Sequence, residues 1–206
     1  TALAAEDRCH LNGLGLVNGR PAFVTALGTT DNARGWRENK RDGGVILSVP
    51  EGEVIARGLA MPHSPRWYGG QLWVLESGTG SLGVIDRANG KYQEVAHLPG
   101  FTRGLDFIGR FAFVGLSQVR ETAIFSGLPI TEQQERNCGV WVVDITTGQT
   151  VAMVRFEDAM QEIFAVQILP GIRYPDLIND NPATIADSFV LPDAASDIAP
   201  VNFAKK

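Results

Sequence analysis

A unit of short apolar strands and tight glycine turns occurs three times along the chain, and it limits the fold more than any other feature. Each copy contains a strand that begins on a glycine, at Gly44, Gly83 and Gly139. Each of these strands runs into a turn that closes on a second glycine, at Gly52, Gly90 and Gly148. An all-strand unit that repeats about every 40 residues is typical of the blades of a β-propeller.

The spacing between the copies shows where residues have been inserted. The first glycines are 39 residues apart (44 to 83) and then 56 apart (83 to 139). The extra residues lie at 27–42 and 117–137, each between the second and third strands of a blade. We therefore predict an all-β protein, a β-propeller with about three and a half four-stranded blades. A β-sandwich also has short, evenly spaced strands and is the alternative.

The repeat also predicts the domain organisation. First strands of successive blades are expected at 14–17, 65–67 and 105–107, and a fourth begins at 163–168 and then stops matching. We assign 1–175 to the blades, as a partial ring, and 176–206 to a non-repeating carboxyl-terminal tail. Because propellers typically have four to eight blades, we expect a longer protein, or a second chain that completes the ring.

The composition excludes several classes of protein. With 44% apolar and 20% charged residues, the chain has the profile of a soluble globular protein. The net charge of −5 provides no basic stripe for nucleic acid, and no apolar run is long enough to span a membrane. Cys9 and Cys138 predict two reduced thiols in a cytoplasmic protein, and a single disulfide bond between them is the alternative.

Several sequence strings carry a resemblance to a known family. They are Glu6-Asp7-Arg8-Cys9-His10-Leu11-Asn12-Gly13, Met61-Pro62-His63-Ser64-Pro65-Arg66-Trp67, Leu98-Pro99-Gly100-Phe101-Thr102-Arg103-Gly104-Leu105, Phe113-Val114-Gly115-Leu116-Ser117 and Ile185-Ala186-Asp187-Ser188-Phe189-Val190-Leu191-Pro192. The chain resembles an uncharacterised bacterial family with a predicted β-propeller-like fold. The resemblance implies that this chain is the carboxyl-terminal part of a longer protein. It implies no activity and no catalytic residue.

The two insertions predict which face of the propeller carries the function. Connections between second and third strands lie on one face of the disc, which we call the loop face, and long loops on a rigid scaffold often bind ligands. Trp36 and Arg37 in the first insertion and Arg120 in the second are therefore candidate ligand-binding residues. We expect the Trp36 ring either to be an exposed contact or to anchor its loop on the disc.

The first strands of the blades begin on the same face, next to the central channel. Alignment of the repeats brings four polar side chains to one mouth, those of Asn12, His63, Arg103 and Glu162. Arg103 would suit a carboxylate or phosphate, and His63 with Glu162 could act as acid and base. A divalent metal held by His10, His63 and Glu162 is a weaker alternative, and otherwise we expect no cofactor.

These features predict a β-propeller binding module that uses the loop face to hold a small polar ligand or a protein partner. The alternative is a propeller-type hydrolase or lyase that acts at the channel mouth, with or without a divalent metal. A third reading is a structural role, in which the segment docks on a partner that completes the ring. The sequence leaves open whether the protein is an enzyme.

Overall fold

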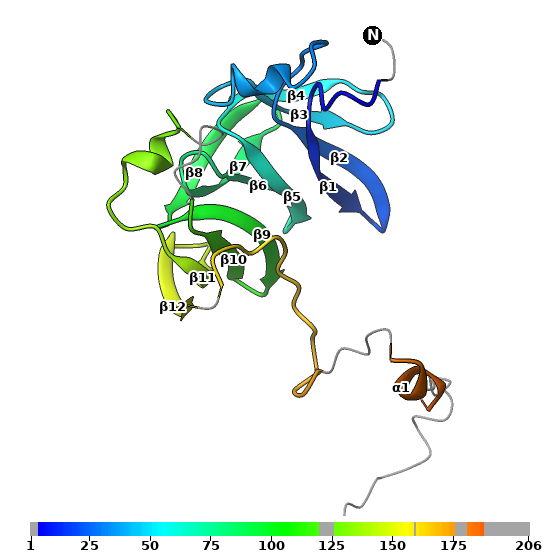
Figure 1. Ribbon diagram of the computed structural model, residues 1–206, viewed down its shortest axis with the longest axis vertical. Helices are drawn as coiled ribbons and strands as arrows, with labels where there is room; N and C mark the ends of the chain where they lie inside the picture. Colours follow the sequence, from blue (N-terminus) through cyan, green and yellow to red (C-terminus); the bar gives the residue numbers. More distant parts are fainter. Residues whose placement is uncertain (1–3, 120–125, 159, 176–180, 188–206) are drawn as a thin grey trace, which may run out of the picture. The chain divides into compact units, whose positions relative to one another are not determined.

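Three antiparallel sheets of four strands form the body of the chain, as Figure 1 shows for the computed structural model. The structure describes residues 4–119, 126–158, 160–175 and 181–187. The strands are β1 (Leu11–Val17), β2 (Arg20–Ala26), β3 (Gly44–Ser48), β4 (Val54–Leu59), β5 (Pro62–Tyr68), β6 (Gln71–Glu76), β7 (Ser81–Asp86), β8 (Lys91–His97), β9 (Phe101–Ile108), β10 (Phe111–Ser117), β11 (Cys138–Asp144) and β12 (Gln149–Phe156).

Each sheet is one blade in which every strand pairs with the next along the chain. The orders are β1-β2-β3-β4, β5-β6-β7-β8 and β9-β10-β11-β12. The first strand of each blade lies beside the first strand of the next, so β1, β5 and β9 are neighbours (Figure 1). The predicted all-β fold with four-stranded propeller blades is confirmed, and the three blades do not close into a ring.

The first strands are longer than the sequence predicted, and each extends further toward the loop face. The pairing register of each one shifts near this end, between Leu11 and Gly13 in β1, between His63 and Arg66 in β5, and opposite Val114–Leu116 in β9. Such bulges break the alternation of side chains while the strand continues. The alternation of apolar and polar residues in the sequence therefore does not show where these strands begin.

Apolar side chains between the blades form two cores. The first joins blades one and two and includes Phe23 and Ile46 against Leu72 and Val74. The second joins blades two and three, with Leu75 packed in the same cluster as the apolar side chains of β9–β11. The four consecutive residues 72–75 of β6 are at most 2% exposed, because the middle blade is covered on both faces.

The outer faces of the first and third blades keep large apolar side chains exposed. Leu14 and Leu16 of β1 are each 48% exposed, and Val154 of β12 is 58% exposed. These are the faces that a further blade would cover on either side of the three.

Both insertions are loops between second and third strands, as predicted. The first contains the short 3-10 helix η1 (Gly35–Arg37), and the second contains η2 (Pro129–Glu132). The loops share one buried apolar cluster, in which Leu27 and Trp36 from the first loop meet Leu128 and Ile130 from the second. The backbone N–H of Ile130 also donates to the carbonyl of Gly78, at 2.9 Å. The two loops are therefore fixed to each other and to the middle blade.

Residues 160–168 follow the third blade without forming a strand ladder. The Ser117 hydroxyl bonds the backbone N–H and carbonyl of Ile163, and the Asp106 carboxylate accepts from the Ile168 N–H at 2.7 Å. The segment therefore lies beside β9, where the sequence predicted a fourth first strand. It lacks the ladder because no described strand pairs with it.

The chain divides into two compact units, residues 1–168 and 169–206. The second contains α1 (Pro182–Ala186), whose N-cap Asn181 accepts from the backbone N–H groups of Ala183 and Thr184. The predicted domain boundary at 175 stays a prediction. Within the described parts of the chain, no helix is long and apolar enough to cross a membrane.

Candidate functional site

A pocket on the loop face gathers polar side chains from four separate parts of the sequence. Its polar lining comes from Asp7 and His10 before β1, Arg37 in η1, His63 in β5 and Arg103 in β9. We call it the loop-face pocket, and its volume is about 210 Å³. Four predicted ligand-binding residues, Trp36, Arg37, His63 and Arg103, thus lie around one small cavity, together with His10 from the metal alternative.

Apolar side chains form the rest of the pocket wall. Leu27 and Trp36 come from the first long loop, and Met61 and Phe101 come from the starts of β5 and β9. All four belong to the buried cluster that joins the two long loops. The pocket therefore depends on the packing of both insertions, and its shape is fixed by side chains that are at most 5% exposed.

The Asp7 carboxylate organises one side of the pocket. One oxygen accepts from the Trp36 indole N–H at 3.0 Å, and the other lies 2.7 Å from Nδ1 of His10. The His10 and Trp36 rings are also packed together, with centroids 4.8 Å apart. Burial acts to raise the pKa of Asp7, but these two hydrogen bonds and the charge of Arg37 prevail and lower it. Asp7 is therefore held as a carboxylate whose two oxygens are both engaged.

His63 is buried with only one ring nitrogen left for the pocket. Its Nδ1 lies 2.9 Å from the Met61 carbonyl and 2.8 Å from the Ser77 hydroxyl, which itself donates to the Thr102 carbonyl at 2.5 Å. Because a carbonyl only accepts, Nδ1 carries the hydrogen and Nε2 has a free lone pair. Burial lowers the pKa of His63 to about 3. The charge of Arg103 also lowers this pKa, whereas the hydrogen bond to Met61 raises it. His63 is therefore a neutral hydrogen-bond acceptor.

Two guanidinium groups supply positive charge to the pocket. Nε of Arg37 is buried and has no hydrogen-bond partner among the described residues, and its Cζ lies 5.4 Å from the centre of the Trp36 ring. Arg103 stacks on the Phe164 ring, with Cζ 4.2 Å from the ring centre. Burial lowers the pKa of Arg103, and the charge of Glu162 opposes this. Cation–π contacts use the guanidinium face and leave the N–H groups free for a ligand.

Two other predicted residues, Asn12 and Glu162, are not among those that line this pocket. The Asn12 amide donates to the Pro62 carbonyl at 3.0 Å and accepts from Thr25 at 2.6 Å, so it joins blades one and two. Glu162 is exposed, although its charge reaches Arg103. Arg120 falls outside the described residues. Of the two alternatives for Trp36, the structure shows the loop anchor: the residue is 4% exposed, because the Asp7 bond and the shared loop cluster hold it in place.

Three residues of the pocket wall have left-handed backbone conformations that non-glycine residues rarely adopt. The φ angles are 50° at Asp7, 52° at His10 and 52° at Met61. Residues held in such conformations tend to cluster at functional sites. The surrounding packing and hydrogen bonds maintain these angles, which favours a binding role for this corner of the fold.

Hydrogen bonds from serine side chains to the backbone connect neighbouring parts of the fold beside the pocket. Ser77, directly after β6, donates to the Thr102 carbonyl of the next blade, and Ser117, the last residue of β10, donates to the Ile163 carbonyl in the same manner. The two serines are 40 residues apart (77 to 117), so the repeat itself carried a signal that the sequence analysis did not use. Ser77 is fully buried and donates to a carbonyl. It positions His63 and is not placed to act as a nucleophile.

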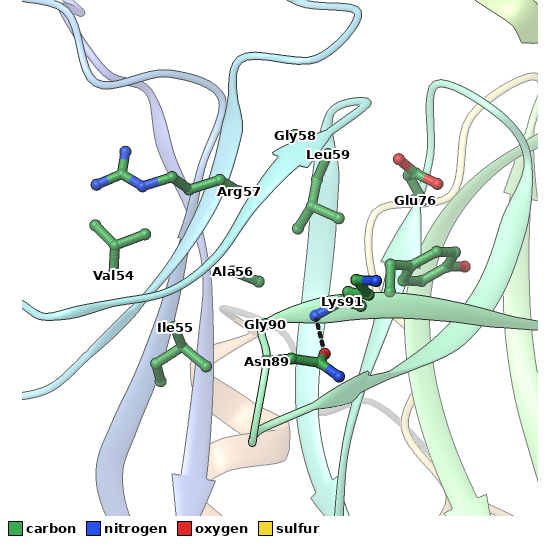
Figure 2. Close-up of a pocket in the computed structure, with 11 residues that line it drawn as sticks. Val54, Ile55, Ala56, Arg57, Gly58, Leu59, Glu76, Asn89, Gly90 and Lys91 are labelled. Carbon is green, nitrogen blue, oxygen red and sulfur yellow. Dashed lines mark hydrogen bonds between the residues drawn. The ribbon is translucent and has the colours of Figure 1, made fainter.

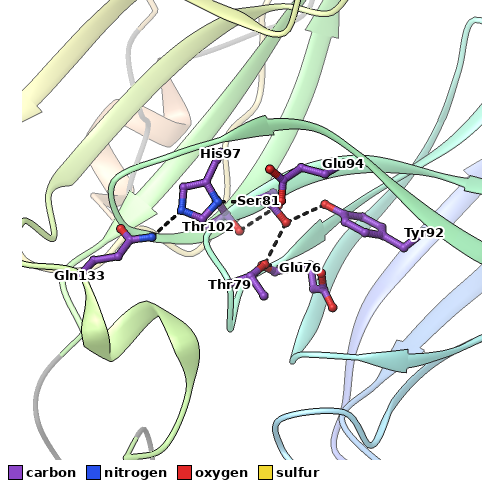
Figure 3. A network of polar contacts seen from close by, with 8 residues as sticks. All are labelled: Glu76, Thr79, Ser81, Tyr92, Glu94, His97, Thr102 and Gln133. Carbon is purple, nitrogen blue, oxygen red and sulfur yellow. Dashed lines mark hydrogen bonds and ion pairs between the residues drawn. The ribbon is translucent and has the colours of Figure 1, made fainter.

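A polar network supports the same region from the middle blade (Figure 3). The Ser81 hydroxyl lies 2.8 Å from the Tyr92 hydroxyl and 2.9 Å from that of Thr79, and its carbonyl accepts from Thr102. Gln133 of the second loop meets His97 at the end of β8, at 2.6 Å between nitrogens. The network ties the second loop and the start of β9 to the middle blade.

A second hollow lies at the rim, between β4 and the β7–β8 hairpin (Figure 2). Its volume is about 560 Å³, and Glu76, Arg57 and Lys91 are among its lining residues. The Glu76 carboxylate accepts from the Ala60 N–H at 2.8 Å, and burial raises its pKa. None of the predicted site residues lines this groove.

The described residues also bear on the metal and thiol predictions. Among them, no group of three or more His, Cys, Asp or Glu side chains is arranged to hold a metal ion. Cys9 and Cys138 are both free thiols, and burial raises the pKa of Cys138.

Comparisons with known proteins identify a family and a general likeness of fold. Three solved structures are similar over part of their length. The match to the designed Ika8 protein (17% identity, TM-score 0.44) covers 77% of this chain and 40% of the Ika8 chain. The match to the designed Ika4 protein (17% identity, TM-score 0.43) covers 78% of this chain and 81% of the Ika4 chain. Hydrazine synthase of Kuenenia stuttgartiensis (14%, 0.45) matches 72% of this chain and 38% of its own.

The chain thus spans less than half the length of two of these three proteins. Because every TM-score is below 0.5, the fold assignment depends on the three sheets themselves. A search of curated proteins gave no match. Bacterial origin and a place at the carboxyl end of a longer protein stay predictions. Residues 1–178 match one family, and the chain therefore belongs to the family described as a domain of unknown function, DUF4915.

Proposed function

We propose that this domain is a propeller-type binding module that holds a small polar ligand in the loop-face pocket. One observation carries the proposal: residues far apart in sequence, among them His63 and Arg103, converge on one cavity beneath two mutually packed loops. Small-molecule sites are typically concave and mostly apolar, with a few polar groups that fix the ligand. This pocket has that composition, although its volume suits only a small molecule.

The Trp36 indole N–H provides a direct test, because it lies in the pocket wall and bonds Asp7. The full chain, labelled with ¹⁵N, is titrated with pools of sugars, nucleosides, amino acids and small organic acids. We expect at least one pool to shift the Trp36 indole signal. The other three tryptophans, Trp67, Trp73 and Trp141, are internal controls. The proposal fails if no pool shifts Trp36, or if the shifts map to the rim groove.

An enzyme that acts at this mouth is the second candidate, and the Asp7–His10 pair favours it. A carboxylate that accepts from Nδ1 of a histidine orients the ring and fixes the tautomer that leaves Nε2 as an acceptor. With His63 nearby as a second acceptor, a hydrolase or lyase would have its acid–base groups in place. Turnover of a compound from the active pool, abolished in His10→Gln, would support this candidate. Binding without turnover would refute it.

A further inference from the structure

Resting on the proposed function, we propose that the loop-face pocket selects a small hydroxycarboxylate. Its carboxylate would lie between the guanidinium groups of Arg37 and Arg103. Its hydroxyl would donate to Nε2 of His63.

The need for an anion follows from the charges around the cavity. Asp7 is the only carboxylate in the described pocket wall, and Trp36 and His10 already occupy its two oxygens. Two guanidinium groups, those of Arg37 and Arg103, thus line the cavity beside one engaged carboxylate, while the charge of Glu162 acts on Arg103 from outside the lining. A carboxylate would satisfy both guanidinium groups with charge-assisted hydrogen bonds.

The need for a hydroxyl follows from His63. Its Nδ1–H is used by the Met61 carbonyl, so Nε2 can only accept. Nε2 is not among the buried unpartnered atoms, which means that the cavity reaches it. A ligand that displaces water from this part of the cavity would therefore pair with Nε2 through a donor. A neutral hydroxyl suits the site better than an ammonium group, because Arg37 and Arg103 would repel a cation.

The cavity also limits the size of the ligand. A volume of about 210 Å³ corresponds to about seven water molecules at about 30 Å³ each. A ligand with fewer than about ten non-hydrogen atoms fits this space. The apolar side chains of Leu27, Met61 and Phe101 would cover its carbon skeleton.

The test compares three probes of nearly equal size on the full chain, with the Trp36 indole signal as the readout. The probes are lactate, lactamide, which lacks the charge, and propionate, which lacks the hydroxyl. We expect lactate to bind ten- to hundredfold more tightly than lactamide, the range for one or two charge-assisted hydrogen bonds. We expect it to bind at least threefold more tightly than propionate.

Variants locate the effect in the pocket. Arg103→Gln should weaken the binding of lactate at least tenfold and leave the binding of lactamide unchanged. Arg103→Lys, which keeps the charge, should lose less affinity for lactate. Arg87→Gln is the matched control, because Arg87 also stacks on an aromatic ring, Trp67, but lies elsewhere. The wild-type pattern of the other indole signals shows that each variant is folded. If Arg103→Gln does not fold, Arg37→Gln replaces it.

The outcomes separate the ligand class from the proposed function. Equal binding of lactate and lactamide, or tighter binding of inorganic phosphate than of lactate, would overturn the hydroxycarboxylate while the pocket remained a binding site. An Arg103→Gln variant with wild-type lactate affinity would also overturn it. If no probe or metabolite pool shifts Trp36, the proposed function itself fails.

Discussion

Burial of neutral His63 should make the stability of this domain fall as the pH is lowered from 7 to 5. The pKa of His63 is about 3 in the folded chain and 6.5 without the fold. Between these values the unfolded chain binds a proton that the folded chain does not, so stability rises with pH. For one such group, the loss from pH 7 to pH 5 is about 1.9 kcal/mol. The size of this loss depends little on the folded pKa, as long as that pKa is below about 4.

The assay is urea unfolding of the wild type and of His63→Asn at pH 5, 6 and 7. Asn keeps a donor near Nδ1, so its amide can still bond the Met61 carbonyl. We expect the variant to be less stable than the wild type at pH 7, and this difference to shrink by about 1.9 kcal/mol at pH 5. His97→Asn, which removes a half-exposed histidine, is the control.

A difference between wild type and His63→Asn that stays constant from pH 5 to pH 7 would refute the reasoning. It would mean that His63 can take up a proton in the folded chain. Nε2 would then be a donor at pH 5 and could not serve as the acceptor on which the proposed ligand depends.

Two further predictions concern the loops and the contact between blades. Ile130→Ala should destabilise the domain by about 2–5 kcal/mol in urea unfolding, because Ile130 is fully buried where the two loops meet. Met153→Ala, at an exposed position, should change stability by less than about 0.5 kcal/mol. Gly19→Ala should lower the free energy of unfolding by about 1–2 kcal/mol, because Gly19 has a φ of +73° and an added Cβ would meet no other atom. Gly90→Ala should lower stability clearly more than Gly19→Ala, because at a φ of +72° the added Cβ would also lie 2.6 Å from the Ile55 carbonyl of the neighbouring blade. Equal losses of stability in the two variants would argue against this contact between blades.

The repeat predicted the fold because turn glycines and loop insertions are local features that recur at the same place in each blade. It did not predict where the first strands begin, because a bulge at His63–Arg66 and its equivalents interrupts the side-chain alternation. The alignment that placed Glu162 near Arg103 agrees with the charge interaction between them. It did not predict that Phe164 stacks on the Arg103 guanidinium.

Two sequence signals predicted residues of the candidate site: the repeat for His63 and Arg103, and the first insertion for Trp36 and Arg37. His63 and Arg103 stand at matching positions near the starts of β5 and β9, so their periodic spacing brought them together. Asp7 and His10 precede the first blade and have no counterpart in the repeat, so no spacing signal marks them. Their role depends on Trp36, which lies in an insertion and meets them only through tertiary packing.

The open faces of the first and third blades do not bear on the proposed site. Every lining residue of the loop-face pocket belongs to residues 1–168, which form one compact unit. The pocket is closed by the contact between the two long loops over β5 and β9, and not by either outer blade face. A chain that covered Leu14 or Val154 would contact outer blade faces, which contribute none of the residues that line this pocket. The binding proposal and the identity of whatever covers those faces can therefore be tested separately.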